Sequence, residues 1–283
     1  MCDESRDDDD ELLTKGINAE RNDFDQCIDA IYQLGECYYH GIGIEKDEIK
    51  AFNLYEEAAG KGQIDAIYNL GFYFQHGIGT ERNKSKTFEL FKEASNRGNI
   101  DAISILGYCY QHGIGTEKDE IKAFELYNDA AEKGQINATY NLAICYQYGI
   151  GIEKNEIIAF GLYKKAEIKG HIISINKLAS CYKNGIGTEK DENKAFELYK
   201  KASNKRDIDS IYHLGYCYQH GIGTEKNEIK AFRLYEEAAE EGHINSMHKL
   251  IYCYSNGIGT EKNKIKVQEL YNELTVIGYK FYE

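Results

Sequence analysis

The sequence predicts an all-α fold, an α-solenoid of seven 36-residue helix-turn-helix repeats, on three observations. A Gly-Ile-Gly triplet recurs every 36 residues without an insertion or deletion. Each interval holds two stretches with helical spacing of apolar residues, and the chain has no proline to interrupt them. A period of this size is typical of stacked repeats that bury a shared core. The triplets begin at Gly41, Gly77, Gly113, Gly149, Gly185, Gly221 and Gly257.

The repeats are expected to fill residues 27–278, with a boundary after the second helix of each copy. The segment 1–26 is interpreted as an acidic, disordered tail and cap, and 279–283 as the C-terminal end. The seven copies are 27–62, 63–98, 99–134, 135–170, 171–206, 207–242 and 243–278.

The third repeat illustrates both helices. In the first, residues 101–112, the apolar positions at i, i+4, i+7 and i+8 define one face, and Gly113 ends the helix. The second runs from Glu120 to about Lys133. The predicted core residues of the two helices are Ala102, Leu106, Cys109, Tyr110, Ala123, Phe124, Leu126, Tyr127, Ala130 and Ala131.

Two columns of equivalent residues support this assignment. Asp119 stands where a second helix begins, and the same column reads Asp47, Asn83, Asn155, Asp191, Asn227 and Asn263, which are good N-caps. Gly107 lies inside a first helix, at a cost of about 1 kcal/mol relative to alanine, which predicts a close helix crossing. Its column reads Gly35, Gly71, Ala143, Ala179, Gly215 and Ile251.

Composition and charge limit the partners. The formal net charge of −13 argues against a nucleic acid, which requires a basic surface. Acidic residues crowd the first eleven positions, which excludes a secretory signal there. No apolar run reaches the length of about 18 residues that a membrane helix requires. We therefore expect a cytoplasmic protein without a membrane-inserted segment.

The repeat pattern resembles the Sel-one-like repeat family, relatives of tetratricopeptide repeats. The resemblance covers residues 27–278. Two segments carry it most clearly: Ala66, Leu70, Gly71, Phe74, Gly77 and Gly79 in one copy, and Lys122, Ala123, Leu126, Tyr127, Ala130, Ala131 and Gly134 in the next.

This resemblance implies a right-handed superhelical scaffold that assembles protein complexes. Family members serve in endoplasmic-reticulum quality control, fungal cell-wall synthase activation and bacterial signalling. Two departures are visible. Leucine stands where the family often has tryptophan, which still fills a core site, and Arg206 replaces the closing glycine of the fifth repeat, so that turn is expected to differ.

No constellation of residues suggests a cofactor, a metal or catalysis. Six of the eight cysteines, Cys37, Cys109, Cys145, Cys181, Cys217 and Cys253, share one column and read as reduced core residues about 10 Å apart. The histidines before the turns, His40, His76, His112 and His220, recur one per repeat and cannot share an ion. The Gly-Ile-Gly triplet ends a helix instead of opening one, unlike a phosphate loop. We expect a non-enzyme.

Binding is expected on the concave face formed by the first helices. The columns of residues 32, 36 and 40 lie off the predicted core stripe and are rich in tyrosine and histidine, which suit protein recognition. Packing between first helices is an equal alternative for the column of residue 32. The predicted contact residues are Tyr32, Tyr68, Phe72, Tyr108, Tyr140, Ile144, Tyr212, Tyr216 and Tyr252.

The sequence therefore predicts a non-enzymatic scaffold or adaptor for protein partners. One alternative is a regulatory subunit of a signalling, kinase-associated complex. A further one, which the absent signal and anchor disfavour, is an adaptor of an endoplasmic-reticulum ubiquitin ligase.

Overall fold

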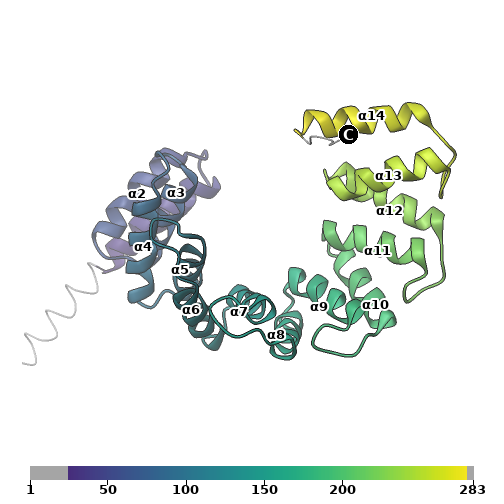
Figure 1. Ribbon diagram of the computed structural model, residues 1–283. Helices are drawn as coiled ribbons and strands as arrows, with labels where there is room; N and C mark the ends of the chain where they lie inside the picture. The colour runs from purple at the N-terminus through teal and green to yellow at the C-terminus, as the bar shows by residue number, and fades with distance from the viewer. Residues whose placement is uncertain (1–24, 279–283) are drawn as a thin grey trace, which may run out of the picture. The chain divides into compact units, whose positions relative to one another are not determined.

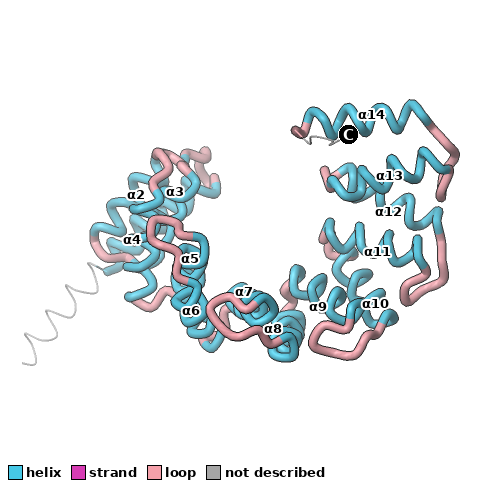
Figure 2. The backbone as a smooth tube through the Cα atoms, viewed as in Figure 1, coloured by secondary structure: helices cyan, strands magenta, loops and turns pink. Residues whose placement is uncertain are grey.

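The computed structural model describes residues 25–278 as helices joined by short turns, with no strand in that range (Figure 2). The acidic tail and the C-terminal segment expected at residues 1–24 and 279–283 lie outside the described part of the chain. The first described helix covers residues 25–40, so it already includes residues 25 and 26, which the sequence assigned to the tail.

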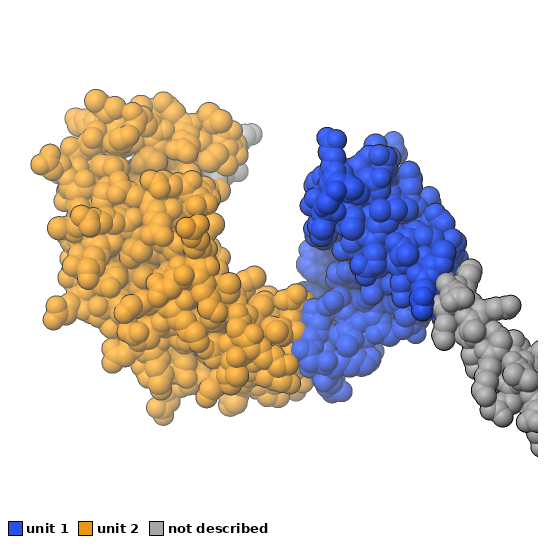
Figure 3. Space-filling view, turned by 180° about the vertical axis from the view of Figure 1, so that it is seen from behind, with its two compact units in different colours: residues 1–135 blue, residues 136–283 orange. Residues whose placement is uncertain are grey.

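The chain forms two compact units, residues 1–135 and 136–283, here called unit 1 and unit 2 (Figure 3). In unit 1 the first helix is followed by α2 (Glu48–Gly60), α3 (Ile64–His76), α4 (Lys84–Asn96), α5 (Ile100–His112) and α6 (Glu120–Glu132). Unit 2 contains α7 (Ile136–Tyr148), α8 (Glu156–Ile168), α9 (Ile172–Asn184), α10 (Glu192–Ser203), α11 (Ile208–His220), α12 (Glu228–Glu240), α13 (Ile244–Asn256) and α14 (Lys264–Val276).

Within each unit every helix packs against the helix before it and the helix after it, as the labelled ribbon shows (Figure 1). Odd-numbered helices are the first helices of their repeats and even-numbered ones the second. Both helices of the third repeat begin within one residue of the positions the sequence predicted. This confirms an all-α solenoid of helix-turn-helix repeats.

An aromatic ring on each second helix is the centre of each repeat's core. Tyr127 is fully buried, and a Cβ atom added at Gly107 would lie 3.0 Å from its Cε1 atom. The close approach predicted at Gly107 is therefore present, and it also reaches the second helix's backbone, because the same Cβ atom would lie 3.3 Å from the Ala123 carbonyl oxygen. The equivalent fully buried rings are Tyr55, Phe91, Tyr163, Tyr199 and Tyr235.

The Gly-Ile-Gly turn has two separate functions. Gly113 adopts a left-handed conformation, with φ 65°, and ends α5 as the sequence predicted. Gly115 also has a positive φ, 70°, and a Cβ atom there would lie 2.1 Å from the carbonyl oxygen of Lys84 in the preceding repeat. The second glycine therefore allows one repeat to pack against the start of the second helix of the repeat before it.

The N-caps of the second helices are formed as predicted. The Asp119 carboxylate accepts a hydrogen bond from the Lys122 backbone N–H at 3.0 Å. In the fifth repeat the closing turn does differ, because α10 ends one residue earlier than its equivalents. Arg206 nonetheless takes the left-handed conformation of the glycine it replaces, with φ 62°.

Some predicted core positions are less buried than expected. Ala102, Leu106 and Cys109 are buried, whereas Tyr110, Phe124 and Leu126 are only partly so. The structure adds Ile103 and Ser104 to the buried set. A first helix between two neighbouring repeats buries a wider stripe than one helix face, because it contacts a second helix on either side.

Truncating a core residue should lower the free energy of unfolding more than removing an N-cap does. We expect Leu106→Ala to lower the free energy of unfolding by about 2–5 kcal/mol, because it leaves a cavity beside Phe88 and Cys109. Asp119→Ala should cost about 1 kcal/mol, because only one capping hydrogen bond is lost. Chemical denaturation of both variants measures the order, and the reverse order would place the core elsewhere.

Two glycines with positive φ, one in open space and one in contact with the preceding repeat, give a matched pair of variants. Gly98 has φ 92° and open space around its missing Cβ, so Gly98→Ala should cost only the strain of a left-handed residue, about 1–2 kcal/mol. Gly115→Ala adds the clash with the Lys84 carbonyl and should cost more than about 3 kcal/mol. Equal losses in urea denaturation would contradict the repeat-to-repeat contact.

Candidate partner-binding face of the first helices

The candidate site is the first-helix face, defined as the surface formed by the columns of residues 32, 36 and 40 in each repeat. Consecutive members within a repeat are four residues apart and so lie above one another on one side of a helix. The structure places the three columns at different depths, from half-buried or buried at column 32 to exposed at column 40.

Column 32 is a packing column. Its rings contact the buried ring of the second helix in the same repeat, with centroids 5.8 Å apart for Tyr32 and Tyr55 and 6.0 Å for Tyr140 and Tyr163. Burial, with the nearby Glu36 carboxylate, raises the pKa of Tyr32 to about 12. Tyr68 and Tyr212 are half-buried in the same way, against Phe91 and Tyr235.

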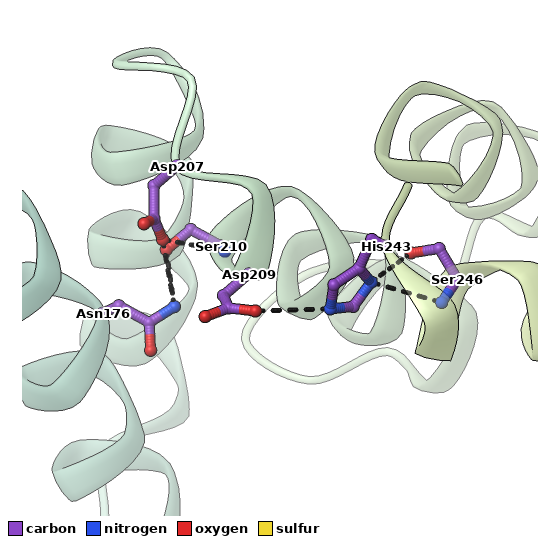
Figure 4. A network of polar contacts seen from close by, with 6 residues as sticks. All are labelled: Asn176, Asp207, Asp209, Ser210, His243 and Ser246. Atoms are coloured by element: carbon purple, nitrogen blue, oxygen red, sulfur yellow. Dashed lines mark hydrogen bonds and ion pairs between the residues drawn. The ribbon is translucent and has the colours of Figure 1, made fainter. Parts of the chain in front are cut away.

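Two polar members of column 32 correct the sequence prediction. Ser104 and Asn176 were expected off the core stripe, yet both are buried. The Asn176 side-chain amide donates to Ser210 Oγ at 2.8 Å and to Asp207 Oδ2 at 3.2 Å, which ties α9 to the start of α11 (Figure 4). A short polar side chain at this position lets the neighbouring first helix approach and cover it.

Column 36 carries aromatic residues toward the surface. Tyr108 and Tyr252 have 43% and 52% of their area exposed, whereas Phe72, Ile144 and Tyr216 are half-buried. Three members stack on the histidine four residues later, with ring centroids 4.2 Å apart: Phe72 on His76, Tyr108 on His112 and Tyr216 on His220. Such pairing holds each ring in one orientation before a partner arrives.

Glu36, in the same column, has a structural contact instead. Its Oε1 accepts a hydrogen bond from the Tyr55 hydroxyl at 2.5 Å and one from the Asn69 amide at 2.8 Å. Because both are internal partners, Glu36 links the first repeat to the second. We do not assign it to the binding surface.

A polar column supports the face from beneath. The buried tyrosine hydroxyls of the second helices donate to glutamines on the first helices, from Tyr127 to Gln111 at 2.8 Å and from Tyr235 to Gln219 at 2.9 Å. In the fifth repeat Lys183 replaces the glutamine. The buried Tyr199 hydroxyl then makes no hydrogen bond of ordinary geometry within the described part of the chain.

An open groove of about 640 Å³ crosses the face in unit 2. It lies between α11 and α13, and Tyr212 and Tyr252 are the two predicted contact residues that line it. Lys249, Lys226 and Glu228 contribute charged side chains to the same groove, and His220 contributes an imidazole whose pKa is lowered by burial and by Lys249 and Lys226. The structure thus brings Tyr212, Tyr252 and the stacked Tyr216–His220 pair into one region.

An Asp–His–Ser line in unit 2 has the chemical composition of a hydrolase triad. His243 Nε2 lies 3.3 Å from Asp209 Oδ1, and His243 Nδ1 lies 2.8 Å from Ser246 Oγ (Figure 4). However, the backbone N–H of Ser246 also donates to Nδ1 at 3.2 Å, and Ser246 is fully buried. A buried hydroxyl has no access to a substrate, so this arrangement caps α13.

The same capping arrangement recurs two repeats earlier. His171 Nδ1 lies 2.7 Å from Ser174 Oγ and accepts the Ser174 backbone N–H at 3.3 Å. The sequence analysis missed this column of first-helix N-caps. Its signal was a side-chain acceptor directly after the closing residue of most repeats, namely Gln63, Asn99, His171, Asp207 and His243.

The cysteine column is in the core. Cys109, Cys145, Cys181, Cys217 and Cys253 are buried, Cys37 is half-buried, and all are free thiols. Burial raises the pKa of Cys109 to about 11, so its thiol is protonated at neutral pH. Between residues 25 and 278 no group of three or more His, Cys, Asp or Glu side chains is placed to hold a metal ion.

Repeated helical pairs with a stacked-aromatic surface define a helical-repeat protein of the solenoid class. The Sel1 repeat model matches residues 28–63, 64–99, 100–135, 136–171, 172–207, 208–243 and 245–271. The chain belongs to the Sel1 repeat family, as the sequence resemblance indicated.

Solved structures agree with this assignment. The chain is similar to a protective antigen of uropathogenic Escherichia coli that displays an SLR fold, with 29% identity and a TM-score of 0.71 over 94% of this chain and 58% of that one. It therefore spans little more than half the length of that relative. A Sel1 repeat protein of Oxalobacter formigenes shares the fold at 24% identity and a TM-score of 0.73, over 89% and 74% of the two chains.

A search among proteins of curated function finds no match. In the part of the chain that the structure describes, no helix is both long and apolar enough to cross a bilayer.

His213 should make the stability of unit 2 depend on pH. It stacks on Tyr199, and burial, reinforced by Lys183, Lys177 and His243 and opposed by Asp209, lowers its pKa to about 4. The neutral form is favoured on folding. The stabilisation is therefore complete above the unfolded pKa of about 6.5 and is lost as the pH falls toward 4, by up to about 3 kcal/mol.

Urea denaturation at several pH values tests this. His213→Phe keeps an aromatic ring beside Tyr199 and should lose less stability than the wild type as the pH falls from about 7 to about 4.5. His112→Phe, at an exposed position, is the control and should follow the wild type. Parallel curves for all three proteins would show that His213 is not responsible.

Proposed function

We propose that this chain is a non-enzymatic protein-interaction scaffold or adaptor that binds its partners on the first-helix face. The observation that carries this proposal is the set of exposed rings on that face, Tyr108, Tyr148 and Tyr252, with 43%, 60% and 52% of their area exposed. Tyrosines of this kind are enriched at binding hot spots, because they offer apolar area with few rotatable bonds.

The same reasoning narrows the proposed contact set. Tyr108, Tyr216 and Tyr252 belong to it, with Phe72 and Ile144 as half-buried neighbours in the same column. The rings of column 32, namely Tyr32, Tyr68, Tyr140 and Tyr212, pack against second helices and contribute mainly to the shape of the face. The ring contacts given above favour packing over partner contact as the role of these four residues.

Three broader parts of the proposal have separate support. A non-enzyme is favoured because the Asp209–His243–Ser246 line ends on a buried hydroxyl. Protein partners are favoured over nucleic acid by the net charge of −13. A cytoplasmic location is favoured by Cys109, Cys181, Cys217 and Cys253, buried thiols with raised pKa values that a reducing compartment preserves.

The test separates binding from folding. A partner is first identified by cross-linking to the wild-type chain, and its affinity is then measured for each variant. Tyr108→Ala and Tyr252→Ala should weaken that affinity, at a cost of about 2 kcal/mol or more for a hot spot, while the melting temperature stays close to that of the wild type.

Two controls complete the experiment. Ser180→Ala lies in the same column without a ring and should change neither quantity. Tyr140→Ala removes a packing ring beside Tyr163 and His171 and should lower the melting temperature. If Tyr108→Ala and Tyr252→Ala melt normally and bind fully, the partner does not use this face.

A further inference from the structure

Basic residues on the first helices are confined to unit 2. Among the described first helices, lysine or arginine occurs only as Lys177, Lys183 and Lys249. Of charged residues, the first helices of unit 1 carry only acidic ones, Asp25, Asp29, Glu36, Asp65 and Asp101, whereas those of unit 2 carry one acidic residue, Asp209. This contrast arises inside a chain whose net charge is −13, so it is not a consequence of overall composition.

Two of the basic residues share equivalent positions. Lys177 and Lys249 stand in one column, which reads Gln33, Asn69, Ile105 and Asn141 in the first four repeats and has His213, with its lowered pKa, between the two lysines. Lys183 occupies the column of glutamines that elsewhere accept tyrosine hydroxyls. The first column therefore carries a lysine in the fifth and seventh repeats, and the second carries one in the fifth alone, between glutamines at Gln147 and Gln219.

Tyr216 brings two of these lysines together. The Nζ atom of Lys183 lies 5.4 Å from the centroid of the Tyr216 ring, and that of Lys249 lies 5.2 Å from it. The two ammonium groups come from α9 and α13, on either side of α11. His220 stacks on the same ring at 4.2 Å. Cation–π contacts thus hold two charges in fixed places on the first-helix face.

These two charges lack an internal counter-ion. Neither Lys183 nor Lys249 forms an ion pair with any residue between 25 and 278. The nearby acidic groups are already engaged, since Glu228 pairs with Lys226 at 2.7 Å and Asp209 with His243 at 3.3 Å. A carboxylate that reached Lys183 and Lys249 would therefore meet donors whose bonding capacity is unused.

The groove between α11 and α13 opens beside these charges. Lys249, His220, Tyr212 and Tyr252 line it, together with Glu228 and Lys226, which pair with each other. Its volume of about 640 Å³ accommodates several side chains of an extended segment. Carboxylates would be held by the lysines and an apolar side chain by the tyrosines.

We propose that the first-helix face of unit 2 binds an acidic peptide segment of a partner protein, with Lys183 and Lys249 as its carboxylate contacts. The proposal rests on the scaffold function above and specifies the chemistry of the partner. Charge complementarity supports it, because the face is basic where the rest of the chain is acidic.

Fluorescence anisotropy with the full chain tests the proposal. The probe is a labelled peptide of about twelve residues that alternates Asp and Glu around one Phe, and the control peptide has Lys at every acidic position. The acidic peptide should bind, less tightly as salt is raised to about 0.15 M and beyond, and the basic peptide should not.

Paired variants locate the binding site. The double variant Lys183→Gln with Lys249→Gln introduces the residue found at both columns in other repeats, as in Gln111 and Gln33. It should lower the affinity for the acidic peptide at least about tenfold. Lys164→Gln with Lys200→Gln removes the same charge from exposed sites on α8 and α10, and affinity should stay within about twofold.

Four outcomes would overturn the proposal. Equal weakening by the two double variants would show that binding follows net charge alone. Tight binding of the basic peptide would show that the face has no preference for carboxylates. Tighter binding after Asp7, Asp8, Asp9 and Asp10 are changed to Asn would show that the acidic run of this chain occupies the face. If the acidic peptide fails while Tyr108→Ala still weakens partner capture, the partner class is wrong but the scaffold function stands.

Discussion

The burial of one aromatic ring beneath a small first-helix residue is the contact on which each repeat depends. Where that residue is Gly107 or Ala143, the ring of Tyr127 or Tyr163 is fully buried. In the last repeat the position holds Ile251, and Tyr271 is 38% exposed. The other rings are also covered by the next first helix, as Tyr55 is by Ala66 and Tyr73, whereas no described helix follows the one that carries Tyr271.

The second glycine of the turn extends this constraint from one repeat to the next at Gly79, Gly115, Gly187, Gly223 and Gly259. Because Gly115 must approach the Lys84 carbonyl, the distance between repeats is set by backbone contact and hardly depends on the exposed side chains. Surface columns can therefore change without disturbing the stacking. This explains how one backbone period carries acidic first helices in unit 1 and basic ones in unit 2.

The sequence predicted the period, the helices and the caps of the second helices, because glycine spacing and apolar periodicity are local signals. It misjudged burial at Ser104 and Asn176, because those positions are covered by a neighbouring repeat and a single-helix pattern does not contain that neighbour. It also missed the caps at His171 and His243, since histidine is an uncommon cap and only the hydrogen bond to Nδ1 reveals it.

The fifth repeat contains a residue, Lys183, that serves the surface at the expense of the core. Every feature of the core favours a glutamine at position 183, because the buried tyrosine hydroxyl beneath it needs an acceptor, as Gln111 and Gln219 provide in other repeats. Lys183 provides none, and in the described part of the chain the Tyr199 hydroxyl makes no hydrogen bond of ordinary geometry. A buried hydroxyl in that position costs about 1–3 kcal/mol. Lys183 places an ammonium group over Tyr216 instead. A local departure that weakens the core while adding an unpaired charge to the surface is the pattern expected of a binding residue.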